Sequence, residues 1–384
     1  MPVTGDAVAR VRGALDRLDL VAARTNCIAD RNDPAVLAAA GETRSGVLQG
    51  EPVTVKDWID VSGFRCSGGD LRHSERRPRQ DASAIARLRR AGAVVIAKTA
   101  VLVEGERFGR VLNPHDLSRS PGGSSSGEGA TVGSGAVRLG IGSDSGGSVR
   151  VPAAWCRVVG MKPSTGLIPL TGHFPRVGDR SDGRTVIGPL ASSVDLAWTA
   201  VTLMAGADGA DGAVSPVALG DPQQVDLSSL RFAAGSPGGT EVSPAMTDAL
   251  DQVTDILQSR GAVLAGPPPA WLDEGRRITE AYWNRAERTG RQIEQDLFDW
   301  DRFRRMTLIE TSRYDLIITP TVAENAPLHR AMVTDDYLFC LPASLTGAPA
   351  ISMPVGEGAV QIIAHRWADH VAVAAARSIA DTGG

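Results

Sequence analysis

Two segments of the chain, residues 81–99 and 243–266, follow one pattern: an amphipathic helix, a glycine and a short apolar strand. In the first, Asp81 is placed to cap the helix N-terminus and Gly92 precedes the run AVVIA; in the second, Gly261 precedes AVLA. Continuous apolar strands are buried on both faces and need helices on each side of their sheet. We therefore expect a single α/β/α domain with a large mixed, mostly parallel sheet covered by helices on both faces.

Composition excludes several classes of protein. The chain has 384 residues and a formal net charge of −4, which argues against a nucleic-acid-binding module. No apolar run approaches the roughly 18–20 residues that span a bilayer. Residues 1–20 have the spacing of an amphipathic helix rather than a signal peptide, so a cytoplasmic protein is expected. The four cysteines form no CxxC pair, and we expect neither disulfides nor a metal.

Lysine is unusually rare in this chain. Of 40 basic residues only three are lysines, namely Lys56, Lys98 and Lys162. Burial can lower the pKa of a lysine until the amine is neutral and basic, whereas arginine stays charged. Lys56 ends the alternating segment PVTVK, so it is a candidate general base. A compositional preference for arginine with chance survivors explains Lys98 and Lys162 equally well, and both are expected to be structural.

Two Ser–Gly clusters, PGGSSSG at 121–127 and SDSGGSVR at 143–150, carry the candidate chemistry. A phosphate-binding loop is disfavoured because the chain contains no Gly-Lys dipeptide and no complete GxGxxG, so no cofactor is expected. Residues 123–127 satisfy GxSxG, which makes an esterase with Ser125 as nucleophile and a histidine base one alternative. In the other alternative, the turn at Gly146 and Gly147 points backbone N–H groups at one spot, as an oxyanion hole requires, and lysine acts through two serines.

The segment from 121 to 164, PGGSSSGEGATVGSGAVRLGIGSDSGGSVRVPAAWCRVVGMKPS, resembles the fingerprint of the amidase signature family. VTVKDWIDVSG is similar to the family's lysine strand, and YDLIITPTV and PASLTGAPAISMPVG resemble its C-terminal strand and helix. The similarity covers most of 45–200 and again 312–356. Within one amidase domain, 1–384, it implies an N-terminal helical segment (1–45), a catalytic core (46–200), a shortened variable region (205–310) and a C-terminal strand–helix part (311–384).

The resemblance also implies roles for individual residues. Lys56 would be the general base, Ser148 the acylated nucleophile, and Ser124 the bridging serine, which the family holds on a cis peptide. The oxyanion would be bound by N–H groups of the loop, those of Ser145, Gly146, Gly147 and Ser148. A buried ion pair between Asp144 and Arg150 is expected to shape this loop, and Lys162 is expected to bond to loop carbonyls.

The resemblance predicts an amidase that converts a small carboxamide to a carboxylate and ammonia or an amine, without metal or cofactor. Residues 271–303 hold six of the 17 aromatic residues, which form either a helical core or an acyl pocket. The pocket interpretation favours aryl or medium-chain apolar acyl groups. Other hypotheses are the amidase subunit of a tRNA-dependent amidotransferase and a non-catalytic binding protein. Neither nucleic acid nor membrane is an expected partner, and the sequence allows a homodimer.

Overall fold

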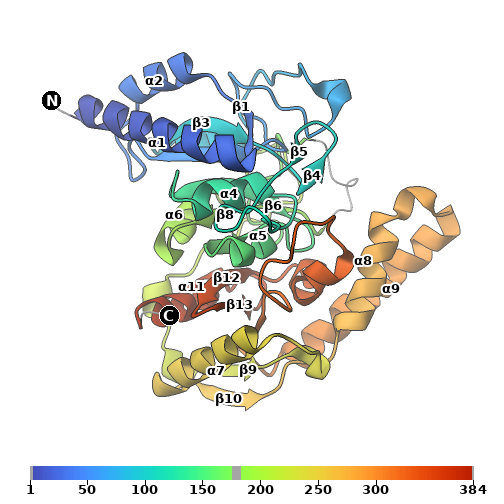
Figure 1. Cartoon of the computed structure of the whole chain (residues 1–384). Coiled ribbons are helices and arrows are strands. Elements are labelled where there is room, and N and C mark those ends of the chain that lie inside the picture. The colour runs from blue at the N-terminus through green and yellow to red at the C-terminus, as the bar shows by residue number, and fades with distance from the viewer. Residues whose placement is uncertain (1–2, 175–182, 383–384) are drawn as a thin grey trace.

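One large sheet organises the molecule (Figure 1). The computed structural model describes residues 3–174 and 183–382. The sheet has eleven strands in the order β1-β3-β2-β6-β8-β7-β12-β13-β11-β9-β10. In chain order these strands are β1 (Ile28–Asp30), β2 (Pro52–Lys56), β3 (Val94–Thr99), β6 (Leu139–Asp144), β7 (Val159–Lys162), β8 (Val186–Ala191), β9 (Arg231–Ala234), β10 (Val263–Gly266), β11 (Leu316–Pro320), β12 (Ala350–Val355) and β13 (Gly358–Ala364). A separate two-stranded sheet pairs β4 (Glu104–Gly105) with β5 (Gly109–Arg110).

The sheet is mixed, as expected, but the prediction that it is mostly parallel is wrong. Strand β2 runs parallel to β3 and β6, and β9 runs parallel to β10 and β11. The pairs β1–β3, β6–β8, β8–β7, β7–β12, β12–β13 and β13–β11 are antiparallel. Helical crossovers produce the parallel pairs, whereas β12 and β13 are joined by a tight turn at Gly356, which requires opposite directions.

Helices cover both faces of the sheet. In chain order they are α1 (Val3–Thr25), α2 (Asp33–Gly41), α3 (Ser83–Arg90), α4 (Ser126–Gly133), α5 (Arg150–Trp155), α6 (Val194–Met204), α7 (Pro244–Ser259), α8 (Leu272–Trp283), α9 (Gly290–Thr311), α10 (Leu341–Thr346) and α11 (Asp369–Ala380). Helices α3, α6, α11 and α7 pack in a row against one face, where Leu139 and Ile141 of β6 enter the main core. Helix α4 packs on the other face of β6, where Gly140 and Gly142 leave room for its side chains.

Both predicted helix–glycine–strand units are present. Helix α3 is followed by Gly92 and β3, and α7 is followed by Gly261 and β10. Both glycines have positive φ, 98° and 90°, a conformation that ends a helix at low cost only for glycine. Asp81 does not cap α3, because the helix begins after Ala82. Its carboxylate instead binds the Arg89 guanidinium and the backbone N–H of Ser62.

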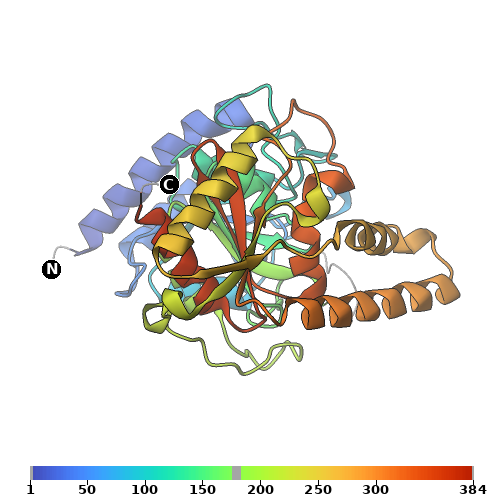
Figure 2. The ribbon, with the colours of Figure 1, turned by 90° about the horizontal axis from the view of Figure 1, so that it is seen from below.

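The region 205–310 contributes both to the sheet and to a projecting arm. Strands β9 and β10 extend the sheet to its far edge. Helices α8 and α9 pack against each other and project from the body, as Figure 2 shows at the right. At the other end of the chain, the predicted amphipathic helix is α1, whose Val11, Leu15 and Leu18 are buried. Within residues 3–174 and 183–382, no helix combines the length and apolar character needed to cross a membrane.

Candidate active site

The sheet order brings the three predicted catalytic residues together. Lys56 is the last residue of β2, Ser124 lies just before α4, and Ser148 lies in the loop between β6 and α5. Strands β2 and β6 are adjacent and parallel, so their carboxyl ends meet at one edge of the sheet. Lys56 and the loop that carries Ser148 are therefore neighbours, although 92 positions separate them in the sequence.

Ser124 contacts both other residues, Lys56 through its hydroxyl and Ser148 through its backbone N–H. The Lys56 Nζ lies 2.7 Å from Ser124 Oγ, and the backbone N–H of Ser124 donates to Ser148 Oγ over 3.2 Å. Lys56 is fully buried, whereas Ser124 and Ser148 retain 6% and 8% of their accessible surface. These contacts thus lead from a fully buried amine to two serines that each keep a small exposed area.

The surroundings of Lys56 favour a neutral amine. Burial lowers the pKa of Lys56 well below its usual value, and the charges of Asp144 and Glu128 oppose this shift without cancelling it. The Nζ also lies 4.0 Å from the centre of the Trp58 ring. Glu128 is buried on α4 and accepts hydrogen bonds from Thr54 and Thr99, which flank Lys56 on β2 and β3. Burial raises the pKa of Glu128 to about 7.

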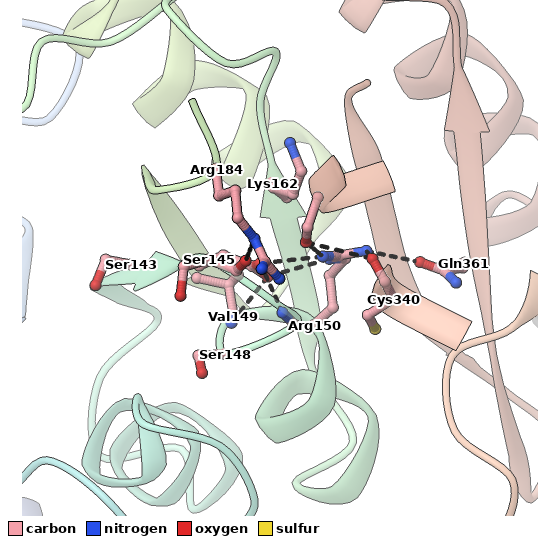
Figure 3. A network of polar contacts seen from close by, with 12 residues as sticks. Ser143, Ser145, Ser148, Val149, Arg150, Lys162, Arg184, Cys340 and Gln361 are labelled. Carbon is pink, nitrogen blue, oxygen red and sulfur yellow. Dashed lines mark hydrogen bonds and ion pairs between the residues drawn. The ribbon is translucent and has the colours of Figure 1, made fainter. Parts of the chain in front are cut away.

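A buried ion pair shapes the loop that carries Ser148, as predicted. Arg150 donates to both carboxylate oxygens of Asp144 at 3.0 Å, and both side chains are completely buried. Arg150 also donates to Cys340 O, Gln361 Oε1 and Ser344 Oγ, which attach the loop to the C-terminal part of the chain. Figure 3 shows that the Ser148 hydroxyl points away from this network. The ion pair therefore fixes the loop without occupying its reactive side.

The predicted oxyanion hole differs from expectation at one residue. The N–H of Gly147 donates to Asp144 Oδ1 over 2.8 Å, so the carboxylate already occupies it. Asp144 Oδ2 likewise accepts the N–H of Val149. Among the described residues, the N–H groups of Ser145, Gly146 and Ser148 have no hydrogen-bond acceptor. These three groups remain candidates for the predicted oxyanion hole, and the Gly147 N–H anchors the loop to Asp144.

Comparison with known proteins decides the family. The sequence model of the amidase family matches residues 9–298, about three quarters of the chain. This chain belongs to the amidase signature family. The match includes most of 205–310, a region that the motifs of the resemblance do not cover.

Several relatives of this amidase-family chain have known names. Fatty acid amide hydrolase of Medicago truncatula is 30% identical over 84% of this chain and 63% of that protein. A glutamyl-tRNA(Gln) amidotransferase subunit of Oleidesulfovibrio alaskensis is 29% identical over 91% of this chain and 86% of that protein. A solved fatty acid amide hydrolase superposes with a TM-score of 0.86 at 20% identity, covering 100% of this chain and 84% of that chain. A peptide amidase bound to chymostatin superposes with a TM-score of 0.81 at 22% identity, covering 99% and 96%. At such identities the superpositions show the fold.

The contacts of the remaining candidates agree with structural roles. Ser125 is fully buried, and its hydroxyl donates to the carbonyl of Ser143. No histidine among the described residues hydrogen-bonds to it, so the esterase alternative gains no support. Lys98 donates to Ile59 O, and Lys162 donates over 3.0 Å to the carbonyl of Pro163, the residue that follows it, rather than to the loop that carries Ser148.

The aromatic residues of 271–303 divide into two groups. Trp300 is buried, and its indole N–H donates to Leu345 O, so it belongs to the core beneath α8 and α9. Trp283 is 38% exposed and lies so close to the nucleophile loop that a side chain on Gly146 would contact its ring. Its ring packs edge-on against Tyr337, 5.6 Å away, and the Tyr337 ring also lies against Gly147 of the same loop. Trp283 and Tyr337 form one aromatic wall beside the nucleophile.

Sequence reasoning missed several polar residues around Lys56. Ser143, at the end of β6, lies 3.1 Å from Lys56 Nζ through its hydroxyl, and His173 Nε2 lies 3.0 Å from the same hydroxyl. Ser143 stands inside the signature segment next to Asp144, which was a usable signal. His173 is one of the histidines open to the esterase alternative, but no sequence pattern relates it to Lys56, and Tyr337 carries no comparable signal. Only the fold brings both residues to this edge of the sheet.

Proposed function

We propose that this protein hydrolyses a carboxamide through an acyl-enzyme on Ser148, with Ser124 and Lys56 as its proton relay. Two observations carry the proposal: Lys56 Nζ contacts Ser124 Oγ, and the backbone N–H of Ser124 holds Ser148 Oγ next to it. Three N–H groups of the loop that carries Ser148 have no acceptor among the described residues. Family membership supports the reaction class, and relatives of this chain are named amide hydrolases and amidotransferase subunits.

Acylation begins with the neutral amine of Lys56. Lys56 takes the proton of Ser124 while Ser124 takes that of Ser148, and Ser148 Oγ bonds to the amide carbonyl carbon. The carbonyl electron pair moves to oxygen, where the N–H groups of Ser145, Gly146 and Ser148 stabilise the negative charge. The C–N bond then breaks, and the leaving nitrogen receives a proton from Lys56 through Ser124.

Deacylation uses the same groups in the same order. A water molecule gives a proton through Ser124 to Lys56 and bonds to the acyl carbon. The bond between that carbon and Ser148 Oγ then breaks, and Ser148 recovers its proton from the relay. The products are a carboxylic acid, which ionises in water, and ammonia or an amine. Lys56 returns to its neutral form, ready for another turnover.

Active-site labelling tests the nucleophile. A serine-directed fluorophosphonate should add one label, and peptide mapping should find it on Ser148. The Ser148→Ala variant should take no label, whereas Ser125→Ala should label normally, since Ser125 only supports the Ser143 backbone. Label on Ser125 in the unmodified protein would contradict the proposal.

The aromatic wall indicates the acyl group. Trp283 and Tyr337 lie beside the nucleophile loop, and each aromatic contact adds about 0.5–1.5 kcal/mol beyond the free energy of burying apolar area. Two such contacts separate a larger apolar acyl group from acetyl by roughly one to two orders of magnitude in kcat/KM. We propose that amides of aromatic or medium-length apolar acids are the substrates.

A rate series tests this specificity. The kcat/KM values should rise from acetamide through hexanamide to phenylacetamide. Trp283→Ala should flatten the series, whereas Trp300→Ala is the matched control, because its indole lies in the core and not beside the loop. A series that is flat in the unmodified protein, or unchanged by Trp283→Ala, would refute the aromatic pocket and leave the acyl-enzyme mechanism standing.

A second candidate function is that of an amidotransferase subunit, because the match covers most of the length of one such relative. The Oleidesulfovibrio amidotransferase protein is matched over 86% of its length, compared with 63% for the Medicago fatty acid amide hydrolase. In that case the protein would supply ammonia from an amide to partner subunits. Copurification of such subunits with the tagged protein from its source, together with amide hydrolysis that depends on them, would favour this function.

A further inference from the structure

A second branch of hydrogen bonds leads from Lys56 to Ser143 and His173. The Lys56 Nζ lies 3.1 Å from Ser143 Oγ and 3.4 Å from Ser143 O. His173 Nε2 lies 3.0 Å from the same Ser143 hydroxyl. Ser143 and His173 are both buried. The polar line at the site therefore has five members, from His173 through Ser143, Lys56 and Ser124 to Ser148.

The backbone holds His173 firmly against the end of β2. His173 forms an antiparallel bridge with Ile59, and the next N–H, that of Phe174, donates to Trp58 O over 2.7 Å. The Trp58 ring packs edge-on against the imidazole at 6.1 Å and also lies 4.0 Å from Lys56 Nζ. This packing sets the direction in which His173 presents Nε2 to Ser143.

The count of hydrogens and lone pairs on Lys56 limits how the branch can be arranged. A neutral amine has two N–H donors and one lone pair. To take a proton from Ser124, the amine must direct the lone pair at Ser124 Oγ, which leaves its two N–H groups for the carbonyl and the hydroxyl of Ser143. Ser143 Oγ then accepts from Lys56, so its own hydrogen must go to another acceptor. Nε2 of His173 is in position to receive it.

We propose that His173 is a positioning residue for the general base. As a neutral imidazole that accepts at Nε2, it orients the Ser143 hydroxyl, and Ser143 in turn orients the amine so that its lone pair faces Ser124. Without that acceptor, the Ser143 hydrogen can turn toward the lysine lone pair and compete with Ser124 for it. The proposal rests on the function proposed above, because it assigns a role to His173 through Lys56.

The side chain of glutamine provides a direct test. His173→Leu removes the acceptor, whereas the amide oxygen of His173→Gln can accept the Ser143 hydrogen. The rate constant for fluorophosphonate labelling of Ser148 should fall roughly 5- to 100-fold in His173→Leu and recover most of that loss in His173→Gln. His115→Leu is the matched control, because that imidazole bonds to the Cys156 carbonyl instead of the relay. Equal losses in the Leu and Gln variants would show that His173 only packs, and would overturn the proposal.

A double-mutant cycle with Ser143→Ala adds an independent measurement. Since His173 acts through the Ser143 hydroxyl, His173→Leu should cost almost nothing further in the Ser143→Ala background. Additive losses would contradict the proposal. If His173→Leu does not fold, the comparison of Ser143→Ala with Ser143→Thr replaces it. The threonine keeps the hydroxyl and should label faster than the alanine, and equal rates would refute the branch.

The same assay separates this inference from the proposed function. Lys56→Ala should lose nearly all labelling of Ser148. If it does so while His173→Leu labels at the unmodified rate, the relay stands and the branch fails. If Lys56→Ala labels normally, the proposed function itself fails.

Discussion

Asp144→Asn should destabilise the protein by about 3–5 kcal/mol, the cost of removing one partner from a buried ion pair. Both Asp144 and Arg150 are completely buried, so water cannot replace the lost partner. Asparagine removes the negative charge and leaves the guanidinium uncompensated. At present one carboxylate oxygen accepts the N–H of Gly147 and the other accepts the N–H of Val149. Asparagine replaces one of these oxygens with an NH2 group, which cannot accept a hydrogen bond. The N–H group bound to that oxygen loses its hydrogen bond, which adds to the loss.

The direction of the Asp144 pKa shift agrees with a favourable ion pair. Burial alone would raise the pKa of Asp144, but the Arg150 charge overrides it and the pKa lies below its usual value. Asp301→Asn is the matched control, because Asp301 is likewise paired with arginine, here Arg304 and Arg305 at 2.7 and 3.0 Å. These side chains are about half exposed, so the control should cost no more than about 1 kcal/mol.

Urea denaturation at neutral pH measures both variants, and comparable m-values would show that the unfolding reactions are comparable. In the folded Asp144→Asn variant the hydrogen bond that fixes Gly147 is weakened or lost. We therefore expect kcat to fall at least tenfold, whereas Asp301→Asn should keep full activity. If Asp144→Asn were destabilised no more than Asp301→Asn, the ion pair would not be what fixes the nucleophile loop.

Three further predictions concern the residues around Lys56. Lys56→Ala should lose several orders of magnitude in kcat, and Lys56→Arg should not restore it because a guanidinium stays protonated; activity in the arginine variant would exclude a neutral base. Burial raises the pKa of Glu128 from its ordinary value of 4.5 to about 7. The contribution of Glu128 to the free energy of unfolding is therefore fully present when the pH is below 4.5 and is lost as the pH rises through 7. Between these values Glu128→Gln should remove a slope of up to about 1.4 kcal/mol per pH unit from the unfolding free energy, and an unchanged slope would contradict this. Gly140→Ala should cost roughly 1–3 kcal/mol, because its methyl group would overlap the fixed Glu128 carboxylate, and Glu128→Ala should reduce that cost in calorimetric melting.

The sequence predicted helix ends and strands correctly where neighbouring residues determine them. Gly92 and Gly261 ended their helices because each adopts a positive φ, and the strand that ends at Lys56 followed from its alternating apolar residues. Asp81 failed as a helix cap because Arg89 and the N–H of Ser62 bind its carboxylate instead. A capping preference is worth about 1 kcal/mol, which such tertiary contacts can outweigh.

The contacts that complete the site depend on the order of the strands, which local patterns do not encode. Trp283 reaches Gly146 from a helix 137 positions later in the chain, and His173 reaches Ser143 across 30 positions. The assumption of a mostly parallel sheet failed for the same reason, since the antiparallel strands β8, β7, β12 and β13 have the same buried, apolar character as the parallel ones. Buried strands of either direction look alike in sequence when both faces are covered.

The three lysines show why burial alone does not identify a base. All three are completely buried, in a chain that uses arginine for nearly every other positive charge. Lys98 and Lys162 direct their amines at backbone carbonyls, which accept hydrogen bonds but have no proton to give. Burial lowers the pKa of Lys162 to about 7, so this amine too can be neutral near neutral pH, yet its contact leads to no hydroxyl. Among the described contacts of these lysines, those of Lys56 alone reach serine hydroxyls, one on the side of the nucleophile and one on the side of His173. A lowered pKa leaves the amine neutral with a free lone pair. Only an amine that also contacts a hydroxyl can take a proton from it.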